Sequence, residues 1–297
     1  MNDYIVRAIT RNGNYRAMVG STTELVREAC ERHSTYPTAS VALGRALTGA
    51  ALMANAGLKP DQRLALKFEG NGPLQRIIVE ADYNGDVRGF IAVPDVEIPL
   101  KNGHLDVAGA LGNAGLLTVS KDLGLKKPYE GIVHLYSSEI AEDLAYYLTE
   151  SEQIPSAVGL GVYISPEKEI HAAGGFLIQV LPPSDDHITD RLTQQVQALP
   201  SVSDLIASGK SPEDILALIF RDIEYDILET RSIRFRCSCS EKRVERVVLS
   251  LGKAEIESLI REHGHAEVKC EYCRNVYNFT KDRLQVLLDE LSKPSKP

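Results

Sequence analysis

The sequence lacks the features that would place the chain in a membrane or on nucleic acid. It has no apolar run approaching the roughly 18 to 20 residues that a membrane span needs, and residues 1–7 have neither the basic end nor the apolar core of a signal peptide. It has no excess of basic residues either, because the formal net charge is -8 and phosphate binding depends on clustered Lys and Arg. We therefore expect a cytoplasmic globular protein with no membrane and no nucleic-acid partner.

Cysteine is also scarce, and its few positions are unevenly spread. Five cysteines in 297 residues are too few for a disulfide scaffold. Cys30 stands alone on the apolar face of a helix that a capping box of Ser21 with Glu24 would begin, so it is predicted to be a buried small hydrophobe. The other four lie between positions 237 and 273 and are the main functional clue.

The pattern of residues 1–181 predicts an N-terminal α+β domain with an antiparallel sheet and helices. The segment 39–56 is crowded with Ala and Gly, which predicts a central, closely packed helix. After Pro60 the apolar residues alternate with period two, and Asn84-Gly85 is a strong hairpin signal between two such runs. Strands joined by hairpins indicate an antiparallel sheet packed on helices.

Residues 182–232 are predicted to form a helical linker after the breaker cluster at 182–186. Ser211 as N-cap, with Pro212 in the first turn, opens a helix with one strongly apolar face. We expect this face to pack on the N-terminal domain, on the C-terminal module or on a partner chain, with ordinary core as the alternative to a binding role. Its residues are Ile215, Leu216, Ile219, Phe220, Ile223 and Ile227.

Residues 233–297 are predicted to form a small zinc-binding domain. Cys237-Ser238-Cys239 and Cys270-Glu271-Tyr272-Cys273 supply four thiolates, which suit a closed tetrahedral zinc site. The module has few large apolar residues and cannot easily fold without the metal, so we expect zinc binding and folding to occur together. A purely structural zinc is the common alternative, and His263 or His265 could replace one cysteine as ligand.

The cysteine pairs also allow redox chemistry. Zinc holds sulfur as thiolate, the form that oxidants attack, and a Cys-x-x-Cys pair can close a disulfide within itself. Cys237 and Cys239 can also close, with more strain, so we expect Cys270 with Cys273 to close first. Each disulfide removes two ligands, so oxidation would expel zinc, melt the module and expose the apolar face of the linker.

These residues resemble the heat-shock protein 33 family of bacterial redox-regulated chaperones. Similar stretches in the body are residues 69–74 (EGNGPL), 87–90 (VRGF), 117–122 (LTVSKD), 128–131 (PYEG) and 151–156 (SEQIPS). The resemblance implies an N-terminal dimerising domain, a helical linker and a zinc domain. It also implies that Cys237, Cys239, Cys270 and Cys273 are both ligands of one zinc ion in the reduced form and the redox switch.

The function implied by this resemblance is that of an ATP-independent holdase. Its reduced, zinc-loaded form is largely inactive, and oxidation with mild unfolding releases zinc, unfolds the linker and exposes a surface for unfolding client proteins. The active form is expected to be a homodimer. The candidate client-binding residues are those of the apolar face at 215–227.

Two other functions compete with the holdase. A thiol-disulfide oxidoreductase would use Cys270 and Cys273, but here a second cysteine pair shares the site. A zinc-ribbon protein that binds nucleic acid or a partner finds support only in Arg231, Arg234 and Arg236, because residues 237–290 hold nine Lys plus Arg against ten Asp plus Glu. Catalytic zinc needs an open coordination position, so no enzyme is expected.

Overall fold

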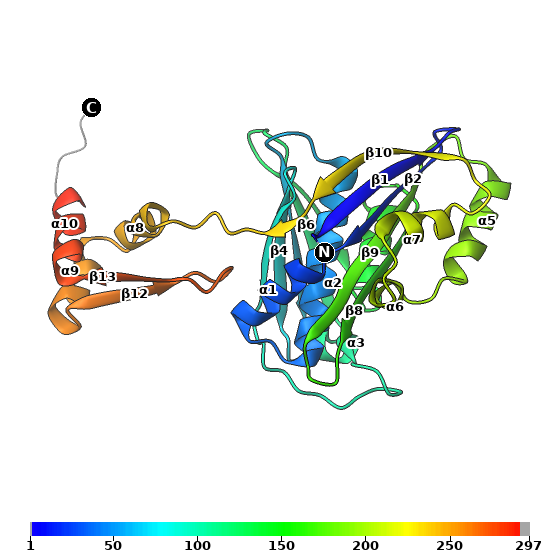
Figure 1. Cartoon of the computed structure of the whole chain (residues 1–297). Coiled ribbons are helices and arrows are strands. Elements are labelled where there is room, and N and C mark those ends of the chain that lie inside the picture. The colour runs from blue at the N-terminus through cyan, green and yellow to red at the C-terminus, as the bar shows by residue number, and fades with distance from the viewer. Residues whose placement is uncertain (1, 292–297) are drawn as a thin grey trace. The chain divides into compact units, whose positions relative to one another are not determined.

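The computed structural model describes residues 2–291 and confirms the α+β class. The chain forms two compact units divided between Arg236 and Cys237, and each is described by itself (Figure 1). The helices of residues 182–232 belong to the same compact unit as the residues before them. The functional division into a dimerisation domain and a linker stays a prediction.

The first unit contains two sheets. The first sheet has five strands in the order β10-β1-β2-β9-β8, all antiparallel to their neighbours (Figure 1). Its strands are β1 (Tyr4–Thr10), β2 (Tyr15–Ser21), β8 (Ser156–Ile164), β9 (Ile170–Val180) and β10 (Tyr225–Ser232).

The second sheet has six strands in the order β11-β5-β4-β3-β6-β7. Only β11, of two residues, is parallel to its neighbour β5. The strands are β3 (Arg63–Gly70), β4 (Arg76–Asp82), β5 (Asp86–Ile91), β6 (Gly115–Asp122), β7 (Tyr129–His134) and β11 (Arg234–Phe235). The predicted hairpin at Asn84-Gly85 is confirmed, because these residues join β4 to β5.

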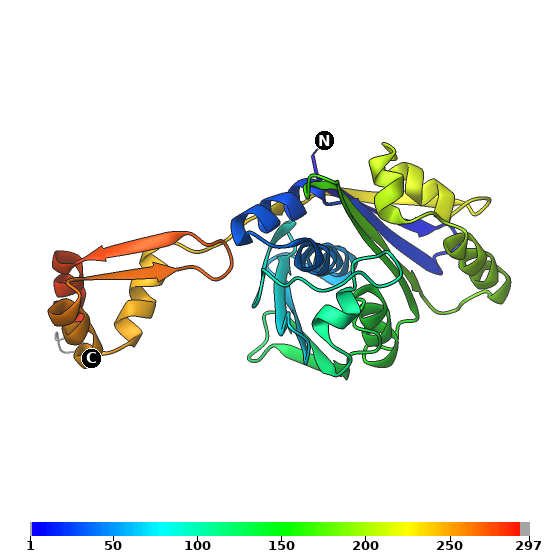
Figure 2. The same ribbon diagram turned by 90° about the horizontal axis from the view of Figure 1, so that it is seen from below.

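Helix α2 (Pro37–Gly57) contacts both sheets and is buried along almost its whole length (Figure 2). Its small residues permit this, because a Cβ atom built on Gly49 would lie 2.4 Å from Cδ1 of Leu144. The predicted central helix is therefore confirmed. Three shorter helices, α1 (Thr23–His33), α3 (Val107–Leu111) and α4 (Ala141–Glu150), complete this part of the unit.

The predicted capping box at the start of α1 is wrong. Ser21 ends β2, and the N-cap residue is Thr22, which makes no side-chain capping bond. The carboxylate of Asp3 instead accepts a hydrogen bond from the backbone N–H of Leu25 at 2.6 Å. A residue distant in sequence thus satisfies a free donor at the helix start. Cys30 is buried on this helix, as predicted.

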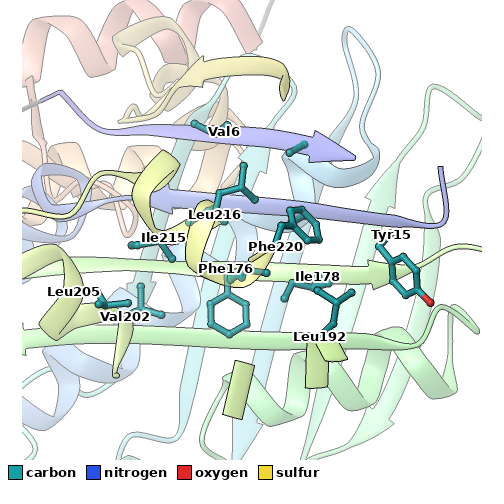
Figure 3. Close-up of a cluster of buried hydrophobic side chains, with 14 residues drawn as sticks. Val6, Tyr15, Phe176, Ile178, Leu192, Val202, Leu205, Ile215, Leu216 and Phe220 are labelled. Carbon is teal, nitrogen blue, oxygen red and sulfur yellow. The ribbon is translucent and has the colours of Figure 1, made fainter. Parts of the chain in front are cut away.

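Three helices cover the face of the five-stranded sheet that points away from α2. They are α5 (Asp186–Gln197), α6 (Val202–Ala207) and α7 (Pro212–Ile219). Figure 3 shows their apolar side chains lying against the strands, where they form one buried cluster with Val6, Tyr15 and Phe176. Ser211 is the N-cap of α7, as predicted, and forms a capping box with Asp214.

The helical linker predicted for residues 182–232 is wrong at its C-terminal end, because β10 is a strand that pairs with β1 along its length. Ile227 lies on this edge strand rather than on the predicted helix, and 49% of its surface is exposed. Helix α7 ends at Ile219, so Ile223 follows the helix and is only partly buried. No helix within residues 2–291 is both long and apolar enough to cross a membrane.

The second unit begins at Cys237 and has a small core of its own. Its elements are α8 (Glu241–Ser250), α9 (Lys253–Glu262), the hairpin of β12 (His265–Lys269) and β13 (Val276–Thr280), and α10 (Lys281–Leu291). The core consists of Val244, Val248, Ile256, Phe279, Leu284, Leu287 and Leu288. Helices α8 and α9 thus lie between the two cysteine pairs.

Candidate metal centre

Two loops of the second unit carry the four cysteines. Cys237 and Cys239 precede α8, whose N-cap Ser240 accepts a hydrogen bond from the N–H of Arg243. Cys270 and Cys273 lie on the turn between β12 and β13. This turn closes through the Cys270 N–H, which donates to the Asn275 carbonyl at 2.9 Å, and through Arg274 N–H, which donates to Cys270 O at 2.8 Å.

The four sulfur atoms meet in one cluster. All four Sγ atoms lie within 4.8 Å of one another. The Sγ atoms of Cys237 and Cys270 are 3.8 Å apart, and those of Cys239 and Cys273 are 3.3 Å apart. Because zinc–sulfur bonds are about 2.3 Å long, a tetrahedral site spaces its sulfurs by roughly 3.8 Å. The cluster therefore fits a single tetrahedral metal ion bound through sulfur.

The surroundings of the cluster shift the pKa values of two of its cysteines in opposite directions. Burial opposes ionisation of Cys239, but hydrogen bonds from the Tyr277 hydroxyl and from the neighbouring thiols outweigh it and lower its pKa. Burial raises the pKa of Cys273 far above its ordinary value. The hydrogen bond between the Tyr277 hydroxyl and Sγ of Cys239, together with slight burial, raises the pKa of Tyr277 to about 12. Four thiolates this close together require a cation, since like charges oppose one another's ionisation.

Polar side chains around the cluster shape its loops. The Tyr277 hydroxyl donates to Sγ of Cys239 at 3.1 Å. The Arg243 guanidinium donates to the Ser238 carbonyl at 2.8 Å and so fixes the loop between the first two cysteines. Sequence reasoning missed Tyr277. The available signal was a phenol four residues after the last cysteine, on the strand that leaves the turn.

Other candidate residues lie outside the cluster. Within residues 2–291, no grouping of three or more possible ligands includes His263 or His265, and a ring nitrogen of His265 lies 2.9 Å from the His263 carbonyl. Cys30 packs with Val26, Ile170 and Ala173 in the first unit, and burial raises the pKa of its thiol. The structure thus brings together the four predicted cysteines and leaves Cys30 apart from them.

The candidate client-binding residues occupy different environments. Ile215, Leu216 and Ile219 of α7 are fully buried, and Phe220, which follows the helix, is almost fully buried (Figure 3). The apolar face of this helix packs on the five-stranded sheet. Of the three packing surfaces that the sequence allowed, it therefore uses the N-terminal domain. These four residues are core in this conformation, and a binding role would require α7 to detach.

A two-sheet α+β unit followed by a small unit with a four-cysteine centre defines a protein with a separate cysteine module. The family model described as Hsp33 protein matches residues 3–280. The chain therefore belongs to the Hsp33 family, which confirms the resemblance and supports a chaperone function. This is a family of chaperones and not a family of enzymes.

Individual relatives match over nearly the whole chain. The 33 kDa chaperonin of Geobacter sulfurreducens is 58% identical over 98% of this chain and 97% of its own length. That of Bacillus licheniformis is 45% identical over 97% of this chain and 100% of its own. The crystal structure of the 33 kDa chaperonin (heat shock protein 33 homolog) from Thermotoga maritima aligns with a TM-score of 0.91 and 38% identity, covering 98% of this chain and 99% of that one.

Proposed function

We propose that the chain is a redox-regulated, ATP-independent holdase that binds unfolding proteins and prevents their aggregation under oxidative and heat stress. The observation that carries the proposal is the convergence of four Sγ atoms within 4.8 Å in a small, separate unit. Cys237, Cys239, Cys270 and Cys273 would hold one zinc ion in the reduced form. Structural zinc supplies on the order of 10 to 16 kcal/mol of folding free energy in small peptides.

Oxidation of these cysteines is the proposed trigger. In each of two steps, two thiolates lose two electrons to hydrogen peroxide and form one disulfide. The peroxide takes up two protons and leaves as two waters. We assign the disulfides to Cys237 with Cys239 and to Cys270 with Cys273. Each disulfide removes two ligands, so the second unit loses the stabilisation that the metal supplied and keeps only a core of seven buried apolar side chains.

The proposed client surface is the apolar face of residues 215–227, together with the face of the five-stranded sheet on which α7 packs. Fourteen buried residues form this cluster, so detachment of the helices would expose a large apolar area. Contiguous exposed apolar patches of that kind bind other proteins. We assign partly unfolded proteins as clients, a homodimer as the active form and the cytoplasm as the compartment. No nucleotide, nucleic acid or membrane enters the proposal.

The rival nucleic-acid function loses its main sequence support. Arg231 pairs with Glu229, and its guanidinium stacks over the ring of Tyr83 at 4.1 Å. Arg234 and Arg236 both pair with Asp86. Two neighbouring carboxylates therefore offset part of the positive charge ahead of the cysteines, which weakens its attraction for phosphates.

Light scattering from an unfolding client tests the proposal. The client is mixed with the reduced, zinc-loaded chain or with the peroxide-treated chain under mild heating. We expect only the oxidised chain to suppress aggregation, and a Cys30→Ala variant to behave like wild type because Cys30 lies outside the cluster. Equal protection by both forms would mean a chaperone without a redox switch. No protection by either form would leave the zinc with a structural role alone.

A further inference from the structure

The chain reaches Cys237 through a short segment that crosses from one sheet to the other. Strand β10 pairs with β1 in the five-stranded sheet, and β11 then pairs with β5 in the six-stranded sheet. Arg236 ends the first unit, and Cys237 is the next residue. Any change in the second unit that travels along the chain to α7 must therefore pass through residues 231–236, which we call the latch.

The first two residues of the latch pair with β1, and few further backbone hydrogen bonds hold the rest of it. The N–H groups of Arg234 and Arg236 donate to the carbonyls of Gly85 at 3.0 Å and Val87 at 2.9 Å. The latch also passes very close to Gly85, where an added Cβ would lie 2.2 Å from the Ser232 carbonyl oxygen. Only glycine therefore fits opposite Ser232, and the strand β11 that follows has just two residues.

One carboxylate attaches two of the three arginines of the latch. Oδ1 of Asp86 lies 2.6 Å from Nε of Arg234, and its Oδ2 lies 3.1 Å from Nη1 of Arg236. The side chain of Asp86 is only 16% exposed, whereas those of the two arginines are 62% and 60% exposed. Asp86 therefore sits beneath the latch and binds it on both sides of Phe235.

The apolar part of the latch rests on α1. Phe235 is 8% exposed, and the Arg32 guanidinium lies over its ring at 5.1 Å from the ring centre. Ile233 is also buried, and its N–H donates to the Asp3 carbonyl at 3.0 Å. The latch thus joins both sheets and α1 immediately before the first cysteine.

We propose that the latch gates activation: it must leave β5 before β10 can leave β1 and before α7 can detach, and Asp86 is the positioning residue that keeps it closed. The inference rests on the proposed function, because it supplies the route from the cysteine module to the buried apolar face. Segments with few backbone hydrogen bonds open at a low free-energy cost. We therefore expect the opening of the latch to be the step that mutations perturb most easily.

The test compares Asp86→Asn with wild type in the full-length chain, after metal analysis has shown both to be zinc-loaded. Asparagine keeps the shape of the side chain but removes the charge that faces two arginines. Hydrogen exchange is followed by mass spectrometry before and after peroxide. We expect amides of residues 231–236 to exchange on the order of tenfold faster in the reduced variant, since a charge-assisted attachment is lost. After peroxide, residues 212–219 should lose protection several-fold sooner than in wild type.

Two further variants control the test. Asp122→Asn makes the same chemical change in the same sheet, where Asp122 pairs with Arg63 at 3.6 Å, and should match wild type. A double variant, Arg234→Gln with Arg236→Gln, removes the partners of Asp86 by changing two exposed side chains instead of the largely buried one. It should reproduce the Asp86→Asn result, and combining all three changes should add little.

The possible outcomes separate the latch from the proposed function. Faster exchange in the latch with unchanged timing in α7 would overturn the inference, and so would unchanged exchange in the latch. Failure of α7 to lose protection in any of the proteins would overturn it as well. If α7 is released sooner in Asp86→Asn but no form suppresses client aggregation, the latch stands and the holdase function fails.

Discussion

Replacing Tyr277 with Phe should weaken metal binding about tenfold while leaving the second unit folded. The Tyr277 hydroxyl donates to Sγ of Cys239 at 3.1 Å, and Phe removes this donor but keeps the ring. Hydrogen bonds to charged groups contribute about 1.5 to 3 kcal/mol, and the low end applies because this side chain is partly exposed. About 1.4 kcal/mol corresponds to tenfold in affinity, and outer residues that bond to metal ligands typically contribute 10- to 100-fold.

Competition with a chromogenic zinc chelator at fixed pH measures this change. Without its donor, the Cys239 thiolate should also react faster with peroxide, so zinc release should begin sooner in Tyr277→Phe. Tyr136→Phe is the control, because it makes the same change on an exposed tyrosine of the first unit. Equal zinc affinity in Tyr277→Phe and wild type, with unchanged circular dichroism, would refute the role assigned to this hydroxyl.

Three further changes test other parts of the structure. Burial raises the pKa of Asp3 to about 6, so its folded-state pKa exceeds the unfolded value, and ionisation destabilises the fold. Relative to Asp3→Asn, wild type should lose up to about 3 kcal/mol of unfolding free energy as the pH rises from about 4 to 6, and denaturant titrations with parallel pH profiles would contradict this. Ile219→Ala should destabilise the first unit by about 2 to 5 kcal/mol in urea because the side chain is fully buried, whereas Ile227→Ala, on the exposed edge strand, should cost well under half of that. Tryptic mapping of the oxidised chain should find each disulfide within one peptide, 237–242 or 270–274. If Cys270 and Cys273 form the first disulfide, a Cys270→Ser variant should release zinc more slowly than wild type in peroxide, and equal rates would contradict this order.

The cysteine cluster could be predicted because its chemistry is local to two short motifs. Each pair needs only a tight loop, and the spacing of 30 residues leaves room for the two helices that separate the pairs. The central helix α2 was equally predictable, since a run of small residues has few uses other than close packing. Which sulfurs of the two loops lie nearest each other could not be predicted, because this depends on how residues 237–239 pack against the turn between β12 and β13.

Strand β10 was missed for a physical reason. It lies at the edge of its sheet, and Ile227 and Leu228 are adjacent in sequence and both exposed, so no period-two pattern marks a buried face. Strand β11 consists of two residues and is held by side chains from residues 32 and 86, which no local pattern reveals. Both strands depend on partners far away in the sequence.

The apolar stripe of α7 continues in the sequence beyond the residue at which the helix ends. Ile223 and Ile227 continue the spacing of Ile215 and Ile219 by fours, yet the helix stops at Ile219 and Asp222 adopts a φ of +59°. Helix α5 stabilises this stop, because Gln195 donates to the Arg221 carbonyl at 2.6 Å and Arg191 donates to the Asp222 carbonyl at 3.2 Å. Carbonyls at a helix end need such partners. The detachment of α5 would therefore also free the turn that leads into β10, so we expect α5, α7 and this turn to open together once the latch has left β5.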